Sequence, residues 1–341
     1  LLRLLRLIEK LKHMTNVVYI IGNGFDLRMG MPTDYPSFLK YYEILKVPSN
    51  EIGAIKDRFS LKMKQKISEG KDKWIDLEIE LGKFTKGETN IELFKDFCKN
   101  VNRELINYLK SVERQSPALS EEEKEKFFCD LESPEQYLRS SKLRQDFLNN
   151  AVTKNEVYSN IISFNYTNTI ERLLDGYADE NSHISVKHIH RTLKNDYVLF
   201  GVNNAEQIEN EEFRKDEDLL DLIVKPKGNA ELGENVDTEC ANIIGNGHIF
   251  YIYGTSLGTT DKIWWDSIMH RYIDYNCVIL YFDHVKEKVQ RGDIEMPALE
   301  RQIRSKVINA MGLPGTEGNY RNRIYVVRNA DIFPYREIKD K

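Results

Sequence analysis

Hydrophobic positions near the start of the chain predict a buried strand followed by a helix. Residues 17–21 (VVYII) are apolar throughout and rich in β-branched side chains, as in a strand that helices cover on both faces. A loop rich in glycine follows, and residues 37–46 (SFLKYYEILK) then carry apolar side chains at helical spacing. This order of strand, glycine-rich loop and helix is typical of the start of an α/β domain.

The second half of the chain repeats this alternation. We expect strands at 160–165, 183–190, 197–202, 248–254, 277–282 and 323–327. Apolar residues at helical spacing lie between several of these strands, at 168–177, 261–273 and 297–311. The predicted fold class is therefore α/β, with a Rossmann-like, doubly wound and mostly parallel sheet.

Residues 49–150 differ in character from the flanking sequence. They contain long charged stretches with apolar residues at helical spacing and no convincing strand, which predicts a large helical insertion. The Rossmann-like nucleotide-binding domain then comprises residues 16–48 and 151–341. Residues 1–15 are an N-terminal extension. Its leucines and basic residues resemble a helix on a membrane or partner surface, but sequence upstream of the domain is the favoured explanation, and we assign it no function.

Composition and charge narrow the classes of partner. Hydrophobic residues make up 41% of the 341 residues and charged residues 30%, as in an ordinary globular protein without a membrane-embedded part. The net charge of −5 provides no long-range attraction to polyanions, so nucleic acid is not expected as a partner. Four widely separated cysteines form no Cys-x-x-Cys pair, so we expect no structural zinc, and scattered thiols suit the reducing cytoplasm.

Polar or small residues follow four of the predicted strands. The first set is Gly22, Asn23 and Gly24, where glycines would let the backbone approach a phosphate at the start of a helix. A tight turn without a ligand explains this pattern equally well. The third glycine of the dehydrogenase fingerprint is replaced by Leu27, which disfavours a hydride-transfer enzyme.

The second and third sets contain an amide and two imidazoles. In residues 163–167 (SFNYT), Asn165 would hydrogen-bond a ribose hydroxyl or a water, and a helix cap formed by Asn165 or Thr167 explains the pattern equally well. His188 and His190 share one face if the strand stays extended. A metal site is the minority interpretation, His188 fits a core position, and His190 is better placed as a general base.

The fourth set follows the predicted strand 248–254. Thr255 and Ser256 offer hydroxyl groups suited to a phosphate or a ribose, whereas Asp261 more simply caps the next helix. Trp264 and Trp265 are expected in the core. Because the carboxyl ends of parallel strands meet at one edge of a sheet, all four sets are expected to line a single cleft.

These motifs together resemble those of the AbiH family of bacteriophage abortive-infection proteins. The similar segments are GNGFDLRMGMPTDYPSFL, WIDLEIEL at 74–81, SFNYTNTIE, VKHIHR and IYGTSLGTTD, in the same order between residues 17 and 261. The family is named for abortive infection, in which an infected cell stops growing or dies before phage can multiply. The resemblance therefore implies a role in antiphage defence.

The same segments are more distantly similar to sirtuins. Gly22, Gly24, Gly30 and Pro32 align with the sirtuin glycine loop, and Gly254-Thr255-Ser256 with the segment that contacts NAD. Asn165 and His190 match the residues near the nicotinamide ribose. The resemblance implies NAD or a related nucleotide as ligand. The lack of Cys-x-x-Cys pairs matches those sirtuin-like defence proteins that lack the zinc module and cleave NAD. Two departures are Arg191, where most relatives have glycine, and Asp26, where sirtuins have a small hydroxyl residue.

The loops and the resemblance together define the expected site. His190 and Asn165 are the expected catalytic residues, and no metal is expected. The expected ligand-binding residues are Gly22, Asn23, Gly24, Phe25, Asp26, Pro32, Thr33, Tyr166, His188, Gly254, Thr255, Ser256, Leu257 and Asp261.

Three functions are compatible with such a site. The leading hypothesis is hydrolysis of the nicotinamide–ribose bond of NAD, with His190 accepting a proton and Asn165 orienting ribose and water. The first alternative is a sensor that binds a nucleotide without cleaving it and acts through an oligomer or a partner. The second is an effector that acts on nucleic acid, for which little in the sequence speaks. A phage-derived trigger and a homo-oligomer are compatible with the first two.

Overall fold

The computed structural model describes residues 14–68, 77–151, 156–177, 183–195, 197–233, 235–284, 294–313 and 321–338. In these residues the strands form a six-stranded sheet in the order β3-β2-β1-β4-β5-β6, and each neighbouring pair is parallel. The strands are β1 (Met14–Ile21), β2 (Glu156–Ser163), β3 (Ile184–His188), β4 (Ile249–Tyr253), β5 (Val278–Asp283) and β6 (Ile324–Arg328). The predicted Rossmann-like α/β fold is confirmed, and its strand order is that of dinucleotide-binding domains.

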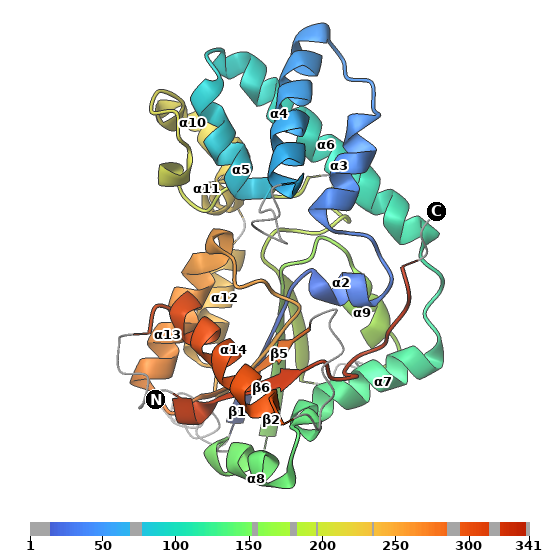
Figure 1. Ribbon diagram of the computed structural model, residues 1–341, viewed down its shortest axis with the longest axis vertical. Coiled ribbons are helices and arrows are strands. Elements are labelled where there is room, and N and C mark those ends of the chain that lie inside the picture. Colours follow the sequence, from blue (N-terminus) through green and yellow to red (C-terminus); the bar gives the residue numbers. More distant parts are fainter. Residues whose placement is uncertain are drawn as a thin grey trace, which may run out of the picture.

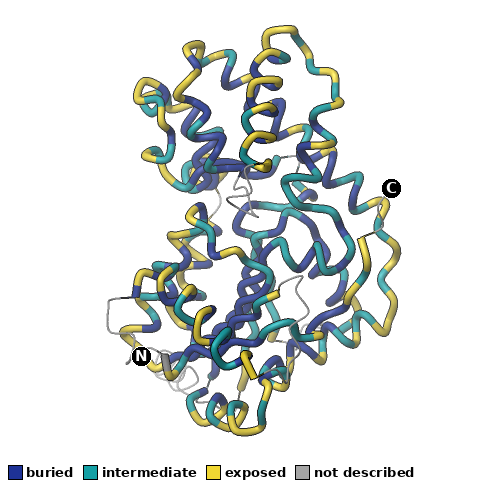
Figure 2. Tube along the Cα trace, in the orientation of Figure 1, coloured by how far each residue is buried: buried dark blue, intermediate teal, exposed yellow. Residues whose placement is uncertain are grey.

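Helices cover both faces of the sheet (Figure 1). Successive side chains of a strand point to opposite faces, so each strand contributes to two cores. Val18 and Ile20 of β1 join a core with the helices α12 (Val236–Gly245), α13 (Lys262–Asp274) and α14 (Met296–Ala310). Tyr19 and Ile21 join the other core, which includes α7 (Glu121–Glu132), α8 (Ser141–Asn150) and α9 (Thr169–Leu174). Trp264 and Trp265 are buried, as expected of core residues. Figure 2 shows the sheet as the buried centre of this part of the molecule.

A group of helices lies beyond the carboxyl edge of the sheet, at the top of Figure 1. It contains α3 (Tyr35–Glu43), α4 (Asn50–Ser68), α5 (Leu77–Phe84), α6 (Ile91–Gln115), α10 (Glu217–Ile223) and α11 (Lys225–Glu231). Lys95 of α6 pairs with Asp216, the N-cap of α10, at 3.3 Å, which joins the two stretches of sequence. None of the helices in the described ranges combines the length and the apolar character needed to cross a membrane.

The proposed division into domains stays a prediction. Between residues 50 and 150 the described chain is helical, without a strand. However, α7 and α8 pack on the sheet, whereas α10 and α11, from the second half of the chain, lie with α4 to α6 (Figure 1). Residues 1–13 of the extension lie outside the described residues, and its last two residues begin β1.

Two strand predictions need correction. Residues 197–202 do not form a strand, and only Val202 makes an isolated bridge, to Val224. The run is apolar because it is buried against α10 and α11, and a Cβ added at Gly201 would lie only 2.0 Å from the Ile223 carbonyl oxygen. The strand predicted to reach residue 190 ends at His188, so His190 lies in the turn that follows.

Glycines allow the loops after β1 and β4 to pack directly against each other. The Gly24 N–H donates to the Gly254 carbonyl oxygen at 2.8 Å, and the Gly22 N–H to the Tyr253 carbonyl oxygen at 2.9 Å. A Cβ added at Gly24 would lie 2.7 Å from the Cα atom of Gly254, which has a left-handed φ of 69°. The glycine pattern that suggested phosphate binding is thus required by the approach of two backbones.

We expect the substitution Gly24→Ala to lower the free energy of unfolding by about 2 kcal/mol, because backbone must move to admit the methyl group. Chemical denaturation measures this loss. Gly245→Ala is the matched control, since nothing lies within 4 Å of an added Cβ there. Equal stabilities of the two variants would contradict the steric role of Gly24.

Candidate functional site at the carboxyl edge of the sheet

The ends of four neighbouring strands lie in one row. The register pairs Ile21 of β1 with Ser163 of β2 and with Tyr253 of β4, and Ser163 pairs in turn with His188 of β3. The four polar loops therefore leave the same edge of the sheet, as predicted. In this strand order the connections diverge between β1 and β4, which is where open α/β sheets form their ligand crevice.

The loop after β1 is held by contacts within the protein. Helix α2 (Gly24–Arg28) begins there, and the Phe25 N–H donates to the Gly22 carbonyl oxygen at 2.9 Å. The Thr33 hydroxyl donates to the Asn23 side-chain oxygen at 2.5 Å, which closes the loop. The Pro32 carbonyl accepts from the Tyr108 hydroxyl at 2.6 Å. The backbone donors of Gly24 and Phe25, which a phosphate would use, are thus already occupied.

Two residues predicted to bind a ligand have side chains in the core. Phe25 is fully buried and packs edge-on against Phe127 and Phe333, with ring centroids 5.5 Å apart in both cases. Leu257 is buried in the core on the opposite face of the sheet and has a positive φ of 55°. We therefore correct the expectation for both: their side chains stabilise the loops rather than line a cleft.

Asn165 is buried without using its side chain. It is 4% exposed, and neither its amide nitrogen nor its amide oxygen has a hydrogen-bond partner in the described part of the chain. The cap interpretation is wrong: Asn168 is the N-cap residue of α9, and the Thr167 hydroxyl donates to Asp26 at 2.7 Å. Because buried amides are normally paired, an unpaired one at the carboxyl edge of the sheet indicates a place for a ligand or water.

His190 lies beside the segment that carries this amide. Phe164 and Tyr166, which flank Asn165, have ring centroids 5.8 and 6.1 Å from the His190 ring. The His190 Nε2 atom is 3.5 Å from an Asp261 carboxylate oxygen, whereas its Nδ1 atom is buried without a partner among the described residues. The segments that carry Asn165 and His190 thus lie side by side, and the catalytic role of the two residues stays a prediction.

A buried lysine organises the groups around His190. The Lys225 ammonium is 2.9 Å from Glu78, 3.5 Å from Asp261 and 3.5 Å from the His190 Nε2 atom. The Tyr166 hydroxyl lies 3.2 Å from the second oxygen of Glu78. Sequence reasoning missed the roles of Lys225 and Glu78. Nothing in the polar stretch around Lys225 signals burial, and Glu78 was noted only as part of the segment 74–81.

The buried surroundings set the protonation of three groups. Burial and the positive charge of Lys225 lower the pKa of His190 from 6.5 to about 4, so the imidazole is neutral at pH 7. Burial opposes the ionisation of Asp261, but Lys225 and the hydrogen bond to His190 outweigh it and hold its pKa below the usual range. Asp261 is therefore a carboxylate that faces His190, and it makes no side-chain cap on α13.

Asp26 is the third such group. It is 1% exposed, and burial raises its pKa to about 7 against the opposing hydrogen bonds from Thr167 and Thr169. One of its oxygens has no partner in the described residues. An acid that titrates near neutrality can change its charge when a ligand enters.

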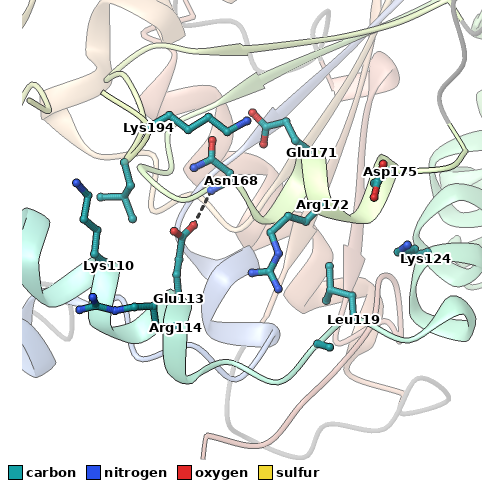
Figure 3. A pocket seen from close by; sticks show the side chains of 12 residues that line it. Lys110, Glu113, Arg114, Leu119, Lys124, Asn168, Glu171, Arg172, Asp175 and Lys194 are labelled. Atoms are coloured by element: carbon teal, nitrogen blue, oxygen red, sulfur yellow. Dashed lines mark hydrogen bonds between the residues drawn. The ribbon is translucent and has the colours of Figure 1, made fainter. Parts of the chain in front are cut away.

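The remaining predicted residues have mixed positions. The Nδ1 atom of His188 lies 2.8 Å from the Asn165 carbonyl oxygen and its Nε2 atom 2.8 Å from Glu171, so its ring is committed to these contacts. The Thr255 hydroxyl oxygen is buried and has no partner within the described ranges, whereas Ser256 is exposed. A cavity of about 710 Å³ opens nearby between α6, α7 and α9, and no predicted site residue lines it (Figure 3).

The comparisons with known proteins agree with the motifs. The model of the family described as bacteriophage abortive infection AbiH matches residues 18–283. The chain belongs to the AbiH family. The match extends from β1 to the end of β5. It contains the groups described above at the ends of the strands, which we call the strand-end site: Asp26, Glu78, Asn165, His190, Lys225 and Asp261. Membership implies a role in abortive infection, a defence against bacteriophage. A comparison with curated proteins gave no match.

We expect Lys225→Met to lower the free energy of unfolding by about 4 kcal/mol, because it leaves Glu78 and Asp261 buried without their cation. Adding Glu78→Gln to this variant should restore part of the loss, and chemical denaturation of both single variants and the double variant measures the coupling. Lys227→Met is the control on the same helix, since its pair with Glu217 is largely exposed and should contribute below about 1 kcal/mol. Equal losses at both lysines would contradict the stabilising role of the buried Lys225 contacts.

His190 should make stability depend on pH in a defined direction. Below pH 6.5 the unfolded chain protonates this histidine, while the folded chain does not until about pH 4, so stability is lost as the pH falls through this window. Relative to His190→Gln, the wild type should lose up to about 3 kcal/mol between pH 7 and pH 4. Denaturation midpoints across this range provide the test. Parallel curves for the two proteins would show that burial does not depress the pKa.

Proposed function

We propose that this AbiH-family protein acts in abortive infection by binding NAD or a related nucleotide at the carboxyl edge of the sheet and hydrolysing its nicotinamide–ribose bond. The observation that carries the proposal is that two neighbouring segments each hold a buried group without a hydrogen-bond partner in the described residues, the Asn165 amide and the His190 Nδ1 atom. Such groups cost free energy unless a ligand completes their hydrogen bonds. An amide and a neutral imidazole suit ribose hydroxyls and an attacking water.

Charge around His190 supports a cationic reaction centre. Lys225 contributes one positive charge and Glu78 and Asp261 one negative charge each, so the three groups sum to −1. The nicotinamide ring of NAD is positively charged, and positive charge moves to the ribose when the bond to the ring breaks. A buried negative charge therefore stabilises bound NAD, with its cationic ring, and also the transition state, in which the ribose is cationic.

The reaction assigns one task to each residue. The electron pair of the N-glycosidic bond leaves with nicotinamide, which becomes neutral, and a water oxygen forms the new bond to the ribose carbon. Asp261 faces the His190 Nε2 atom; when that atom carries the ring proton, Nδ1 is free to accept the proton of water. Asn165 orients the ribose or the water. The products are nicotinamide, ADP-ribose and a proton.

A nucleotide sensor is the second candidate, and two observations favour it. A histidine whose pKa is about 4 is a weak base at pH 7. The N–H groups of Gly24 and Phe25 are also occupied by the chain, so a pyrophosphate would need other donors. In this alternative the same residues bind NAD or ADP-ribose, and occupancy changes an oligomer or a partner contact instead of leading to cleavage.

Release of nicotinamide from NAD tests the proposal. We expect the purified protein, alone or with extract of phage-infected cells, to form nicotinamide, and His190→Ala to slow this by on the order of 100-fold. Asn165→Ala should slow it as well, because the ribose and water lose their partner. His183→Ala is the matched control, since His183 is exposed just before the amino end of β3.

Two results would change the conclusion. Full activity of His190→Ala would remove His190 as the base. Intact NAD under all conditions, combined with calorimetric binding of NAD that Asn165→Ala abolishes, would establish the sensor instead of the hydrolase.

A further inference from the structure

A cavity beside α9, the helix that follows the segment with Asn165, is a second candidate site. The cavity of about 710 Å³ is within the range of small-molecule sites, and its walls come from the end of α6, the start of α7 and helix α9 (Figure 3). Its twelve lining residues include five basic and three acidic side chains. None of the groups that surround His190 is among them, so the cavity is separate from the strand-end site.

Basic side chains outnumber acidic ones in this cavity, and two of its three acids are already engaged. The Asn168 N–H donates to Glu113 at 2.9 Å, and Glu171 contacts the His188 ring at 2.8 Å. By contrast, no side-chain hydrogen bond or ion pair within the described chain holds Arg114 or Arg172, and the Arg172 guanidinium extends into the space between α9 and α6 (Figure 3). Unengaged guanidinium groups bind phosphate strongly because they donate two parallel hydrogen bonds.

A buried acceptor on the same wall adds a second, independent indication of a ligand. Asn168 is 7% exposed, and its side-chain oxygen is buried without a hydrogen-bond partner in the described residues. This oxygen lies in the cavity wall between Lys194 and Glu113 (Figure 3). It requires a donor, and a hydroxyl group of a sugar phosphate is one that can supply it.

We propose that this cavity binds a small phosphorylated molecule, with Arg172 on the phosphate and Asn168 on a hydroxyl group of the ligand. Arg114, Lys110, Lys124 and Lys194 add positive charge around it. The volume admits a ligand up to the size of a nucleotide. This binding does not depend on NAD hydrolysis at the strand-end site.

The cavity is connected to the strand-end site by two short contacts. Glu171 in its wall holds the His188 Nε2 atom, and the His188 Nδ1 atom holds the Asn165 carbonyl, both at 2.8 Å. A phosphate near Glu171 competes for the cations around that carboxylate and alters its hold on His188. Occupancy of the cavity therefore acts on the backbone of Asn165, which makes the ligand a regulator of the strand-end site.

Calorimetry with two probes tests the binding. Inorganic pyrophosphate and ribose 5-phosphate should both bind saturably to the full chain. The double variant Arg114→Gln/Arg172→Gln should weaken both by at least about 10-fold, because a charge-assisted contact and a neighbouring positive charge are lost. Asn168→Ala should weaken ribose 5-phosphate by about 5-fold and pyrophosphate less, since the Asn168 oxygen accepts from a sugar hydroxyl group.

Controls separate this cavity from other basic surfaces. Arg103→Gln changes an exposed arginine of the same helix α6 outside the cavity and should bind as the wild type, and so should Asn165→Ala at the strand-end site. Circular dichroism checks that the variants are folded. Absence of saturable binding by either probe, or wild-type binding by the double arginine variant, would overturn the proposal.

Histidine-selective NMR tests the connection without any assay of activity. The His188 ring signals, assigned by their loss in His188→Gln, should shift when the cavity is saturated with pyrophosphate. The ring of His183, which is exposed before the other end of β3, should keep its signals. Unmoved His188 signals at saturation would overturn the regulatory link.

Discussion

The buried contact of Lys225 with Glu78 and Asp261 is the interaction on which the strand-end site depends. It joins α5 and α11 from the group of helices beyond the sheet to the loop that follows β4. A buried ammonium loses its hydration, and only well-placed carboxylates compensate for that loss. The two parts of the molecule must therefore stay in register for Lys225 to be tolerated, and the position of Asp261 against His190 follows from that register.

Lys225 and burial together set the charge states at this edge. Burial and Lys225 keep His190 neutral, whereas burial and the nearby Glu113 raise the pKa of Asp26 to about 7. Asp26 thus gains its negative charge most easily when a positive group lies beside it, and His190 gains a positive charge most easily beside a negative one.

The fold was largely predictable from sequence, because burial on both faces makes parallel strands such as β1 and β4 continuous apolar runs. The order of polar loops at strand ends also located Asn165 and His190, since topology alone brings those ends together. Long-range partners were not predictable. Lys225 and Glu78 lie 147 positions apart, and neither has a local pattern that reveals burial or pairing. The strand predicted at 197–202 was wrong because the segment is buried against helices. Such a segment is apolar throughout, and its sequence therefore looks like that of a buried strand.

The end of β3 shows most clearly what sequence periodicity cannot supply. In an extended strand His188 and His190 would face the same way, yet the strand stops at His188 and the chain turns. Arg191, directly after His190, takes a left-handed φ of 66°, which costs a non-glycine residue about 1 kcal/mol or more. This turn sends His188 toward Glu171 and the neighbouring cavity, and His190 toward Lys225 and Asp261. Two histidines that look like one motif thus lie in two different environments, because the strand ends between them and the strained Arg191 follows.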